Sequence, residues 1–422
     1  MAQLSMFPEA KTPELTEHDQ PMAKSDLSIQ PGEMLRIGRH ELYCGDCVEV
    51  MKGFPDNSVD CIVTDPPYGI NFMSGSIKWD SSIPDNEWAK ECLRILKPGG
   101  HLIAFAATRT FHRLGMVVEQ SGFEIRDTIN WLYFSGFPKS LSVDKSLDSH
   151  FGAEREIIGK SQRHGVGKLT GKAWNIPPEI PNITKPKTKE AIQYSGYGTA
   201  LKPSFEPAIL ARKPLSEKTI ALNVLEWGTG GINIDGCRFG YGDPCWVGPN
   251  DEVGPRSIGG YRDKYVGGKI KKNFSTNDPG GRWPANIYQC PKASRSEREL
   301  GCDELPVKSG AEAVNRKPGS AGMDNPRAGA GRTAETVKNF HPTVKPVKLM
   351  KWLASLVMPP HEDAVLLDTF MGSGSTIVAA QLCGFRSIGI DLEPDYIRIA
   401  HARVQNAIPK WLRGMNPDPL PW

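Results

Sequence analysis

The sequence VDCIVTDPPY occupies residues 59–68 and joins an apolar run to an acid, two prolines and an aromatic residue. A short apolar run without alternation is typical of a strand that is buried in a parallel sheet. Pro66 and Pro67 cannot donate the hydrogen bonds of a strand, so we expect the strand to end before them. Ligands of open α/β sheets bind beyond the carboxyl ends of the strands. The Asp65 carboxylate, the proline carbonyls and the Tyr68 ring are therefore suited to hold a planar ring that carries an amine.

The chain has 422 residues, of which 39% are hydrophobic, and its formal net charge is +3. This length allows two or three domains, or one domain with a large insert. No apolar run approaches the ~20 residues of a membrane span, and residues 1–34 lack the apolar segment of a signal peptide. We therefore expect a disordered tail at residues 1–34 and a second tail at residues 409–422. The small positive charge permits a nucleic-acid partner without requiring one.

The nine cysteines are an odd number and are spread thinly along the chain. This pattern is typical of reduced thiols and predicts a protein of the cytoplasm. The spacings among Cys237, Cys245, Cys290 and Cys302 match no zinc motif, and the CxxC of residues 44–47 stands alone. We expect buried thiols and no metal site.

Strand and helix patterns alternate over residues 35–137. The expected strands are residues 35–43, 59–64, 101–107 and 125–134, and the expected helices are residues 47–54, 88–96 and 110–119. Strand, helix and strand at this spacing imply parallel βαβ units, and hence an α/β fold with a doubly wound, mostly parallel sheet. Asp46 follows the first of these strands. It could bind a ligand there or cap the next helix, and the residues leave both readings open.

Residues 138–340 differ in composition and form a large irregular insert, rich in Gly, Pro, Asn and Ser. Within it, residues 206–213 are expected to form a strand that returns antiparallel beside residues 125–134 and closes the edge of the sheet. Residues 219–226 are expected to form a helix. A compact domain rarely carries so much loop unless the loop binds something.

The insert also contains a basic cluster in which aromatic residues are interleaved. Its members are Arg256, Arg262, Lys264, Lys269, Lys271 and Lys272, with Tyr261, Tyr265 and Phe274 among them. Such a cluster suits contacts with the phosphates of a nucleic acid, although a run of charge is also the pattern of a solvated face.

Regular patterns return after residue 341. The expected elements are a helix at residues 347–357, a strand at 364–368, a helix at 377–382, a strand at 386–390 and a helix at 394–404. The Gly-rich turn TFMGSGST joins the first of these strands to the helix that follows it. Strand, Gly-x-Gly turn, helix, strand and acid is the arrangement of a nucleotide-binding site.

The details of this turn indicate which nucleotide it suits. Gly372 and Gly374 let a ligand approach the backbone, and Asp391, about 20 residues further on, is placed to bind ribose hydroxyls. Ile377 stands where a dinucleotide motif has its third glycine, and Phe370 precedes the glycines. The turn therefore favours an adenosine ligand without phosphates over a pyrophosphate.

Three motifs carry a resemblance to a known family. DPPY at residues 65–68, HPTVKP at residues 341–346 and DTFMGSGST at residues 368–376 resemble, in this order, the β-group of S-adenosylmethionine-dependent DNA amino-methyltransferases. In that group the catalytic half precedes the cofactor half, a circularly permuted motif order. The resemblance covers residues 35–137 and 341–405, and it extends loosely to residues 206–213, 228–238 and 281–286.

The resemblance implies a Rossmann-like methyltransferase fold with S-adenosylmethionine as cofactor. Residues 35–137 would form its catalytic half and residues 341–408 its cofactor half. The insert at residues 138–340 would include the target-recognition region and contact DNA. In the catalytic half, Asp65 and the Pro66 carbonyl would accept hydrogen bonds from the target amine. Pro67 would complete the motif, and Tyr68 would stack on a base flipped out of the duplex.

The resemblance also implies the residues that bind the cofactor. They are Asp46, Thr343, Lys345, Asp368, Phe370, Gly372, Gly374, Thr376 and Asp391. Asp391 would bind the ribose, and Asp46 would lie near the adenine or the methionine moiety. Thr343 and Lys345 would lie near the methionine end.

The target that we expect is the N6 amine of adenine, because Asp at the position of Asp65 is typical of the adenine enzymes. The cytosine N4 relatives more often have Ser there, and cytosine N4 is the alternative. A nicotinamide or flavin oxidoreductase would use the Gly-rich turn but leave the DPPY motif unexplained. A non-catalytic DNA-binding module would not need that motif intact, and a protein-glutamine methyltransferase usually begins it with Asn. A cognate restriction endonuclease, and a monomer or a homodimer, are left open by the sequence.

Overall fold

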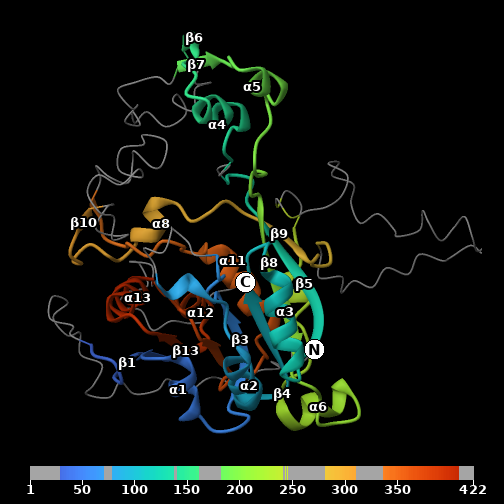
Figure 1. Ribbon diagram of the computed structural model, residues 1–422. Coiled ribbons are helices and arrows are strands. Elements are labelled where there is room, and N and C mark those ends of the chain that lie inside the picture. Colours follow the sequence, from blue (N-terminus) through green and yellow to red (C-terminus); the bar gives the residue numbers. More distant parts are fainter. Residues whose placement is uncertain are drawn as a thin grey trace, which may run out of the picture.

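A nine-stranded sheet forms the centre of the protein in the computed structural model (Figure 1). Its strands, in spatial order, are β1 (Met34–Ile37), β2 (His40–Cys44), β13 (Arg386–Asp391), β12 (Val365–Asp368), β3 (Val59–Thr64), β4 (Leu96–Phe105), β8 (Phe205–Arg212), β5 (Glu124–Leu132) and β9 (Ile287–Gln289). The residues that the structure describes are 29–70, 78–136, 140–160, 182–240, 243, 245, 281–309 and 336–407.

The sheet is mostly parallel. Neighbouring strands run parallel from β2 through β13, β12 and β3 to β4, and β5 runs parallel to β9. Only the pairs that involve β1 or β8 are antiparallel. Strands from the two ends of the chain meet where β12 pairs with β3. The predicted doubly wound α/β sheet is confirmed.

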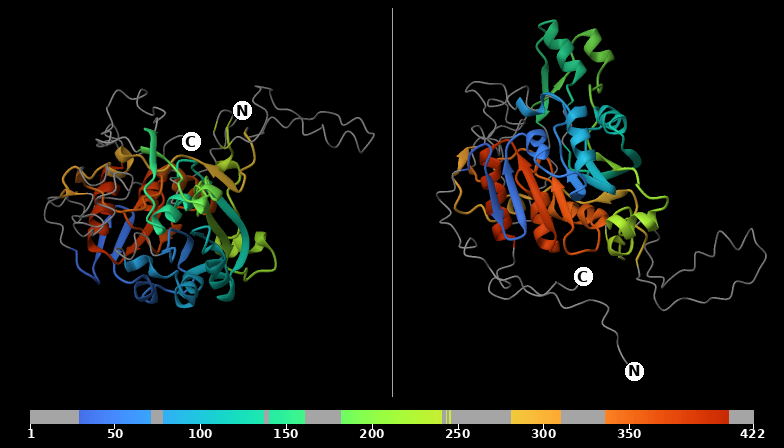
Figure 2. Two further views of the ribbon diagram at one scale, coloured as in Figure 1. Left: turned by 45° about the horizontal axis from the view of Figure 1, so that its top comes forward. Right: turned by 90° about the horizontal axis from the view of Figure 1, so that it is seen from below.

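Helices cover both faces of this sheet (Figure 2). They are α1 (Cys47–Lys52), α2 (Asn86–Ile95), α3 (Phe111–Gln120), α11 (Val347–Val357), α12 (Ser375–Cys383) and α13 (Pro394–Asn406). A further helix, α6 (Ile220–Trp227), lies near the start of β4, where Asn223 Nδ2 donates to the Pro98 carbonyl at 2.8 Å. Strand β3 shows why its sequence does not alternate. Cys61 and Val63 pack into the core on the side of α11, whereas Ile62 packs into the core on the side of α2. Both faces of the strand are therefore buried, as expected for a central parallel strand.

The N-terminal region differs from the prediction in two ways. Residues 35–43 form a hairpin of β1 and β2 instead of one strand, because the chain turns at Gly38, whose φ of +52° is a backbone conformation that glycine adopts readily. Ile29 is fully buried, so residues 29–34 belong to the folded part and not to a tail. Residues 1–28 and the predicted tail at 409–422 lie outside the described residues.

The strand predicted at residues 206–213 is confirmed as an antiparallel neighbour of β5, but its predicted place at the sheet edge is wrong. Strand β8 lies between β4 and β5, and β9 forms the edge instead. Strand β9 spans only residues 287–289, which is too short for a hydrophobic period to show in the sequence. Two segments of the insert thus belong to the central sheet. Strand β4 also begins earlier than predicted, at Leu96.

Part of the insert forms an arm that projects from the sheet (Figure 1), defined here as residues 140–160 and 182–203. It contains α4 (Val143–His150), β6 (Glu156–Lys160), β7 (Asn182–Lys185) and α5 (Lys189–Gln193). The arm leaves the carboxyl end of β5 and returns at the start of β8, where Leu132 and Phe205 are paired. Arg155 ties α4 to β7: it pairs with Asp144 at 2.8 Å and Asp148 at 2.7 Å on α4, and it donates to Thr184 Oγ1 at 2.9 Å on β7.

All nine cysteines are buried and free. Within the described part of the chain, no three His, Cys, Asp or Glu side chains are grouped so that they could hold a metal ion. No helix among the described residues is long and apolar enough to span a membrane.

Candidate active site

A cavity of about 310 Å³ lies at the carboxyl ends of the central parallel strands. Its walls come from four places: residues 45–47 after β2, residues 65–70 after β3, residues 368–376 after β12 and residues 391–396 after β13. Residues 341–345, which precede α11, also line it, together with Trp79, Asp80 and Met350. The DPPY motif and the Gly-rich turn therefore line one cavity, although about 300 residues of sequence separate them.

The DPPY turn is held in place by a buried acid that the sequence analysis did not single out. The backbone N–H groups of Tyr68 and Gly69 donate to Asp80 Oδ1 at 2.7 and 3.1 Å. Thr110 Oγ1 donates to the Tyr68 carbonyl at 2.8 Å. These bonds replace the strand pairing that the prolines prevent, and they fix the turn where the strand ends.

Asp65 lies in a cluster of charged and hydroxyl groups at one end of the cavity. Its Oδ1 accepts a hydrogen bond from the Tyr68 hydroxyl at 2.8 Å, and its Oδ2 contacts the ammonium of Lys345. Lys345 Nζ also lies 3.0 Å from Tyr68 Oη and 3.3 Å from Glu206 Oε2. The structure thus places Lys345 against the DPPY motif, and its predicted place near the methionine end of the cofactor stays a prediction. Sequence reasoning missed Glu206, which gave no signal except an acid at the start of an apolar strand.

Burial and neighbouring charges shift the titration of this cluster. Burial raises the pKa of Asp65, and the charge of Glu206 adds to that rise while Lys345 opposes it. Burial alone would lower the pKa of Lys345, but the charges of Asp65 and Glu206 outweigh it and raise that pKa. Burial also raises the pKa of the Tyr68 hydroxyl. At neutral pH the lysine is charged and the tyrosine is neutral.

Asp368 fixes the start of the Gly-rich turn. Its carboxylate accepts hydrogen bonds from Thr64 Oγ1 at 2.7 Å, from the Phe370 N–H at 3.1 Å and from Thr376 Oγ1. Burial raises its pKa to about 6. Thr64 belongs to β3, so these bonds tie the turn after β12 to the strand that carries the DPPY motif.

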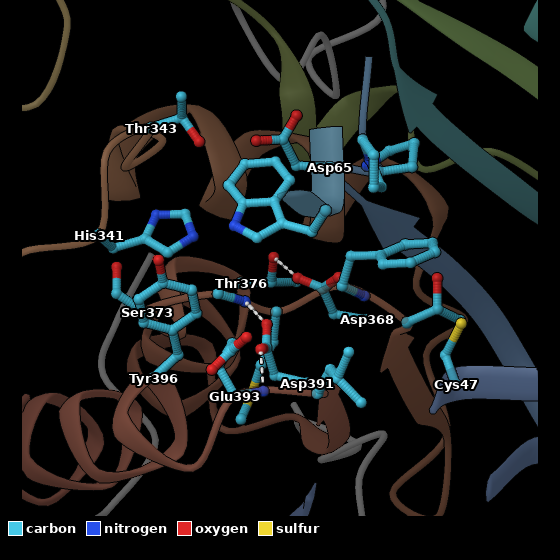
Figure 3. Close-up of a pocket in the computed structure, with 18 of the residues that line it drawn as sticks. Cys47, Asp65, His341, Thr343, Asp368, Ser373, Thr376, Asp391, Glu393 and Tyr396 are labelled. Carbon is cyan, nitrogen blue, oxygen red and sulfur yellow. Dashed lines mark hydrogen bonds between the residues drawn. The ribbon is translucent and has the colours of Figure 1, made fainter. Parts of the chain in front are cut away.

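Asp391 lies beside the same turn (Figure 3). Its two carboxylate oxygens accept the backbone N–H groups of Gly372 at 2.8 Å and Glu393 at 2.9 Å. Burial raises its pKa to about 7. A carboxylate offers about four acceptor sites, so Asp391 keeps capacity for two hydroxyl groups of a ligand.

The two glycines of the turn have different surroundings. A Cβ on Gly372 would lie 2.5 Å from His341 Nε2, so this glycine leaves room for the His341 ring. A Cβ on Gly374 would lie 2.7 Å from the Cβ of Ala400, and Gly374 does not line the cavity. Gly374 therefore lets α12 pack closely on α13, and it is not placed to touch a ligand.

Aromatic rings form one wall of the cavity, where Figure 3 shows His341 beside Tyr396. The His341 ring is stacked on Trp79 with 6.3 Å between centroids, and it meets the Tyr396 ring edge-on at 4.5 Å. Burial lowers the pKa of His341 to about 3, so the ring is neutral. Its Nδ1 has no hydrogen-bond partner within the described part of the chain. Trp79 and Tyr396 carry no sequence motif, and the sequence analysis did not propose them.

The other predicted cofactor residues also line the cavity. Phe370 packs on Trp88 at 6.0 Å, and Thr343 lies near His341. Asp46 caps α1, accepting the N–H groups of Val48 at 2.9 Å and Glu49 at 3.2 Å, and it reaches the cavity as well. The capping reading of Asp46 is therefore confirmed, and its contact with a ligand stays a prediction.

The predicted DNA-contacting residues lie outside the described residues. They are Arg256, Arg262, Lys264, Lys269, Lys271 and Lys272.

The charge of the cavity lining restricts the ligands that suit it. Lys345 is the one lysine or arginine among the described residues of the lining, and it is engaged by Asp65. Six carboxylates line the same space: Asp46, Asp65, Asp80, Asp368, Asp391 and Glu393. Such a lining repels phosphates and suits a ligand with positive charge, hydroxyl groups and an aromatic ring.

Comparisons with known proteins show the family of the chain. A family described as DNA methylase matches residues 59–402. The Type II methyltransferase M.HpaI of Haemophilus parainfluenzae is 31% identical over 107 residues, which cover 24% of this chain and 33% of that protein. The Type II methyltransferase M.BamHI of Bacillus amyloliquefaciens is 38% identical over 88 residues, covering 18% of this chain and 19% of that protein. The chain thus spans a third or less of the length of these relatives.

A solved structure with a similar arrangement is that of the PvuII DNA methyltransferase, described as cytosine-N4-specific. It covers 86% of each chain with 14% identity and a TM-score of 0.42. A likeness of this degree does not bear on which base is the substrate.

Proposed function

Because the chain belongs to the DNA methylase family of N6 and N4 amino-methyltransferases, we propose that it transfers a methyl group from S-adenosylmethionine to the exocyclic N6 amine of adenine in DNA. The observation that carries the proposal is the single cavity that is lined both by the DPPY motif and by the Gly-rich turn. A methyl donor and an acceptor amine can only react if both are bound in contact.

The cavity fits S-adenosylmethionine better than it fits a dinucleotide. Bound there, the cofactor would supply a methyl group on a positively charged sulfonium. The carboxylates of the lining would favour that charge, and Asp391 would accept hydrogen bonds from the ribose hydroxyls. The rings of Phe370, Trp79 and Tyr396 offer apolar walls for adenine. The one basic side chain of the described lining is paired with Asp65, so a pyrophosphate would find no counter-charge. This argues against the oxidoreductase alternative.

The DPPY motif would hold the acceptor. An aromatic amine is a weak nucleophile because its lone pair is delocalised into the ring. Asp65 and the Pro66 carbonyl would accept its two N–H groups, draw the nitrogen toward tetrahedral geometry and aim its lone pair at the methyl group. Tyr68 would stack on the base. Positioning and electrostatics then carry the catalysis, and the amine loses a proton after the transfer.

The arm is the described part of the insert that is best placed to contact DNA. It leaves the carboxyl end of β5, on the edge of the sheet where the cavity lies (Figure 1). It carries six exposed lysines, against three exposed glutamates: Lys145, Lys160, Lys185, Lys187, Lys189 and Lys202. Lysines on such an arm can neutralise phosphates on either side of a flipped base. Flipping costs a few kcal/mol, which such contacts would offset.

Adenine is favoured over cytosine by the resemblance of the first motif position, Asp65, to the adenine enzymes. Incubating the purified protein with duplex DNA and methyl-labelled S-adenosylmethionine, and then digesting the DNA to nucleosides, tests this directly. We expect the label in N6-methyladenine. Label in N4-methylcytosine would replace adenine by cytosine and keep the reaction class, whereas no label in DNA would contradict the proposed function.

The Asp65→Ala variant tests the division of roles in the cavity. We expect methyl transfer to fall by about a thousandfold or more, because an acceptor for the amine is lost from a buried site. The dissociation constant for S-adenosylmethionine should change by less than about threefold, since Asp65 would bind the acceptor amine and not the methyl donor. Calorimetric titration with the cofactor measures this, and a loss of cofactor binding would show that the roles are wrongly assigned.

A further inference from the structure

Four charged side chains form a chain of contacts that runs from the DPPY motif to the protein surface. Lys345 lies between two carboxylates, contacting Asp65 and lying 3.3 Å from Glu206 Oε2. On the far side, Lys292 Nζ lies 3.3 Å from Glu206 Oε1. The Tyr68 hydroxyl bridges the two carboxylates, at 2.8 Å from Asp65 and 3.2 Å from Glu206. Only Asp65, Tyr68 and Lys345 belong to the motifs of the family resemblance.

The lysine at the centre of this network has little freedom to leave it. The side chain of Lys345 is 6% exposed. Its ammonium lies over the rings of Phe105 at 4.9 Å and Trp131 at 6.0 Å, which project from β4 and β5. Water cannot solvate this buried ammonium group, so the two carboxylates must balance its charge. The relative strength of the two Lys345 ion pairs, with Asp65 and with Glu206, therefore decides how tightly Asp65 is ion-paired.

The position and the charge of Glu206 are both set by its surroundings. It lies at the start of β8, where it is paired with Trp131 of β5. Burial alone would raise the pKa of Glu206, but the charges of Lys345 and Lys292 outweigh it and lower that pKa. Glu206 is therefore ionised at neutral pH and competes with Asp65 for the same ammonium.

This competition matters for the acceptor role of Asp65. Lys345 and Tyr68 already occupy one site on each of its oxygens. A carboxylate in an exclusive buried ion pair is a weaker hydrogen-bond acceptor, because the lysine neutralises the charge that the amine would otherwise meet. A second carboxylate that also pairs with the lysine weakens this neutralisation, so Asp65 keeps more of its negative charge.

We propose that Glu206 is a positioning residue for the methyl transfer: it draws Lys345 away from an exclusive ion pair with Asp65, so that Asp65 keeps the charge and the free acceptor site that the target amine needs. The inference rests on the proposed function. It adds a residue outside the recognised motifs to the machinery of that reaction.

The proposed role of Glu206 predicts the direction in which the pH dependence of the reaction should change when Glu206 is replaced. The titratable and charged groups that face Asp65 are Lys345, Glu206, Tyr68 and Asp368. The charge of Glu206 raises the pKa of Asp65, so removing that charge lowers it. The ionised carboxylate of Asp65 is a stronger hydrogen-bond acceptor for the amine than its protonated form. The acid limb of the rate profile should therefore move to lower pH in a Glu206→Gln variant, while the plateau rate falls.

The test is the single-turnover rate of methyl transfer to DNA at saturating S-adenosylmethionine, measured from pH 5 to pH 9. For Glu206→Gln we expect the plateau rate to fall about tenfold and the acid limb to move to lower pH. Glu206→Asp keeps the charge and should recover most of the rate. The matched control is Glu124→Gln, which removes a carboxylate that pairs with Arg212 at 2.6 Å at the other end of the same two strands.

Each result separates the inference from its alternatives. A Glu206→Gln protein with the rate and profile of the wild type would overturn the inference. A lower rate with an unmoved acid limb would also overturn it, since that is the mark of a merely structural residue. Cofactor affinity and melting temperature, which should match those of Glu124→Gln, report whether the variant is folded. A wild-type protein that transfers no methyl group to DNA would contradict the proposed function itself, and the inference with it.

Discussion

At the scale of single residues, several acids line the cavity, and their different hydrogen-bond partners give them different roles. Asp368 has all its hydrogen bonds inside the protein and shapes the Gly-rich turn. Asp391 accepts two backbone N–H groups and keeps sites for a ligand. Asp65 faces a lysine and a tyrosine and would meet the acceptor amine. Asp80 accepts the backbone N–H groups of Tyr68 and Gly69 and so fixes the turn that carries Tyr68.

The pH dependence of cofactor affinity should follow Asp391. Burial raises its pKa to about 7, so the side chain is protonated below that pH and ionised above it. Ribose hydroxyls donate to the ionised form, hence the dissociation constant for S-adenosylmethionine should rise as pH falls below 7. The limit is about tenfold per pH unit. Calorimetric titration between pH 6 and pH 8 measures this.

The variant that isolates this effect is Asp391→Asn, which cannot titrate. We expect it to bind the cofactor more weakly at pH 8 and with no rise in dissociation constant toward pH 6. Asp363→Asn serves as the control, because that side chain is 91% exposed and pairs with Arg386 at the surface. A wild-type dissociation constant that stays flat from pH 6 to pH 8 would contradict the role of Asp391.

At the scale of elements, the site depends on where parallel strands end and how the next helix begins. Each of β2, β3, β12 and β13 ends at the cavity, and each is followed by residues that line it. Gly374 lets the turn after β12 reach α12 in a left-handed conformation, with φ of +76°. The packing of α12 on α13 is therefore part of how the turn is shaped.

The Gly374→Ala variant should be markedly destabilised. Its methyl group would both strain the backbone and lie 2.7 Å from the Cβ of Ala400 on α13. Gly384→Ala is the matched control, since Gly384 has a φ of +72° but nothing within 4 Å of the added Cβ. We expect the control to lose about 1 kcal/mol of unfolding free energy and Gly374→Ala to lose at least ~2 kcal/mol. Denaturant titration measures both, and equal losses would show that the contact with Ala400 is unimportant.

At the scale of the whole molecule, one sheet is assembled from three parts of the chain. Residues 34–132 and 365–391 supply its parallel centre, and the insert supplies β8 and β9. The arm is an excursion between two strands that are already paired at Leu132 and Phe205. At the neck of the excursion, the Tyr133 N–H donates to the Ser204 carbonyl at 2.9 Å. The sheet therefore does not need the arm in order to close.

Replacing residues 137–202 by a short Gly-Ser linker should separate cofactor binding from DNA binding. We expect cofactor affinity to stay within about twofold and affinity for duplex DNA to fall tenfold or more, because phosphate contacts are lost. The salt dependence should weaken by a slope of roughly 0.9 for each lost contact. Fluorescence anisotropy with labelled DNA measures both quantities. Unchanged DNA affinity and salt dependence would show that the arm does not contact the nucleic acid.

The sequence was informative where a pattern repeats or where chemistry is confined to a motif. Strand β3 and the turn after β12 were both predictable, because each joins an apolar run to residues that end a strand. Strand β9, with three residues, and the hairpin turn at Gly38 gave too little pattern to be seen. Asp80, Trp79 and Glu206 join the site only through tertiary contacts. No local pattern marks such residues, so only the folded chain reveals them.

The most direct test of the central claim is a comparison of genomic DNA from a methylation-free host that expresses either the wild-type chain or Asp65→Ala. Single-molecule sequencing of both genomes would report modified bases at nucleotide resolution. The account predicts N6-methyladenine at defined sites with the wild type and none with Asp65→Ala, at equal levels of folded protein. Unmodified DNA with the wild type, or the same methylation with both proteins, would contradict it.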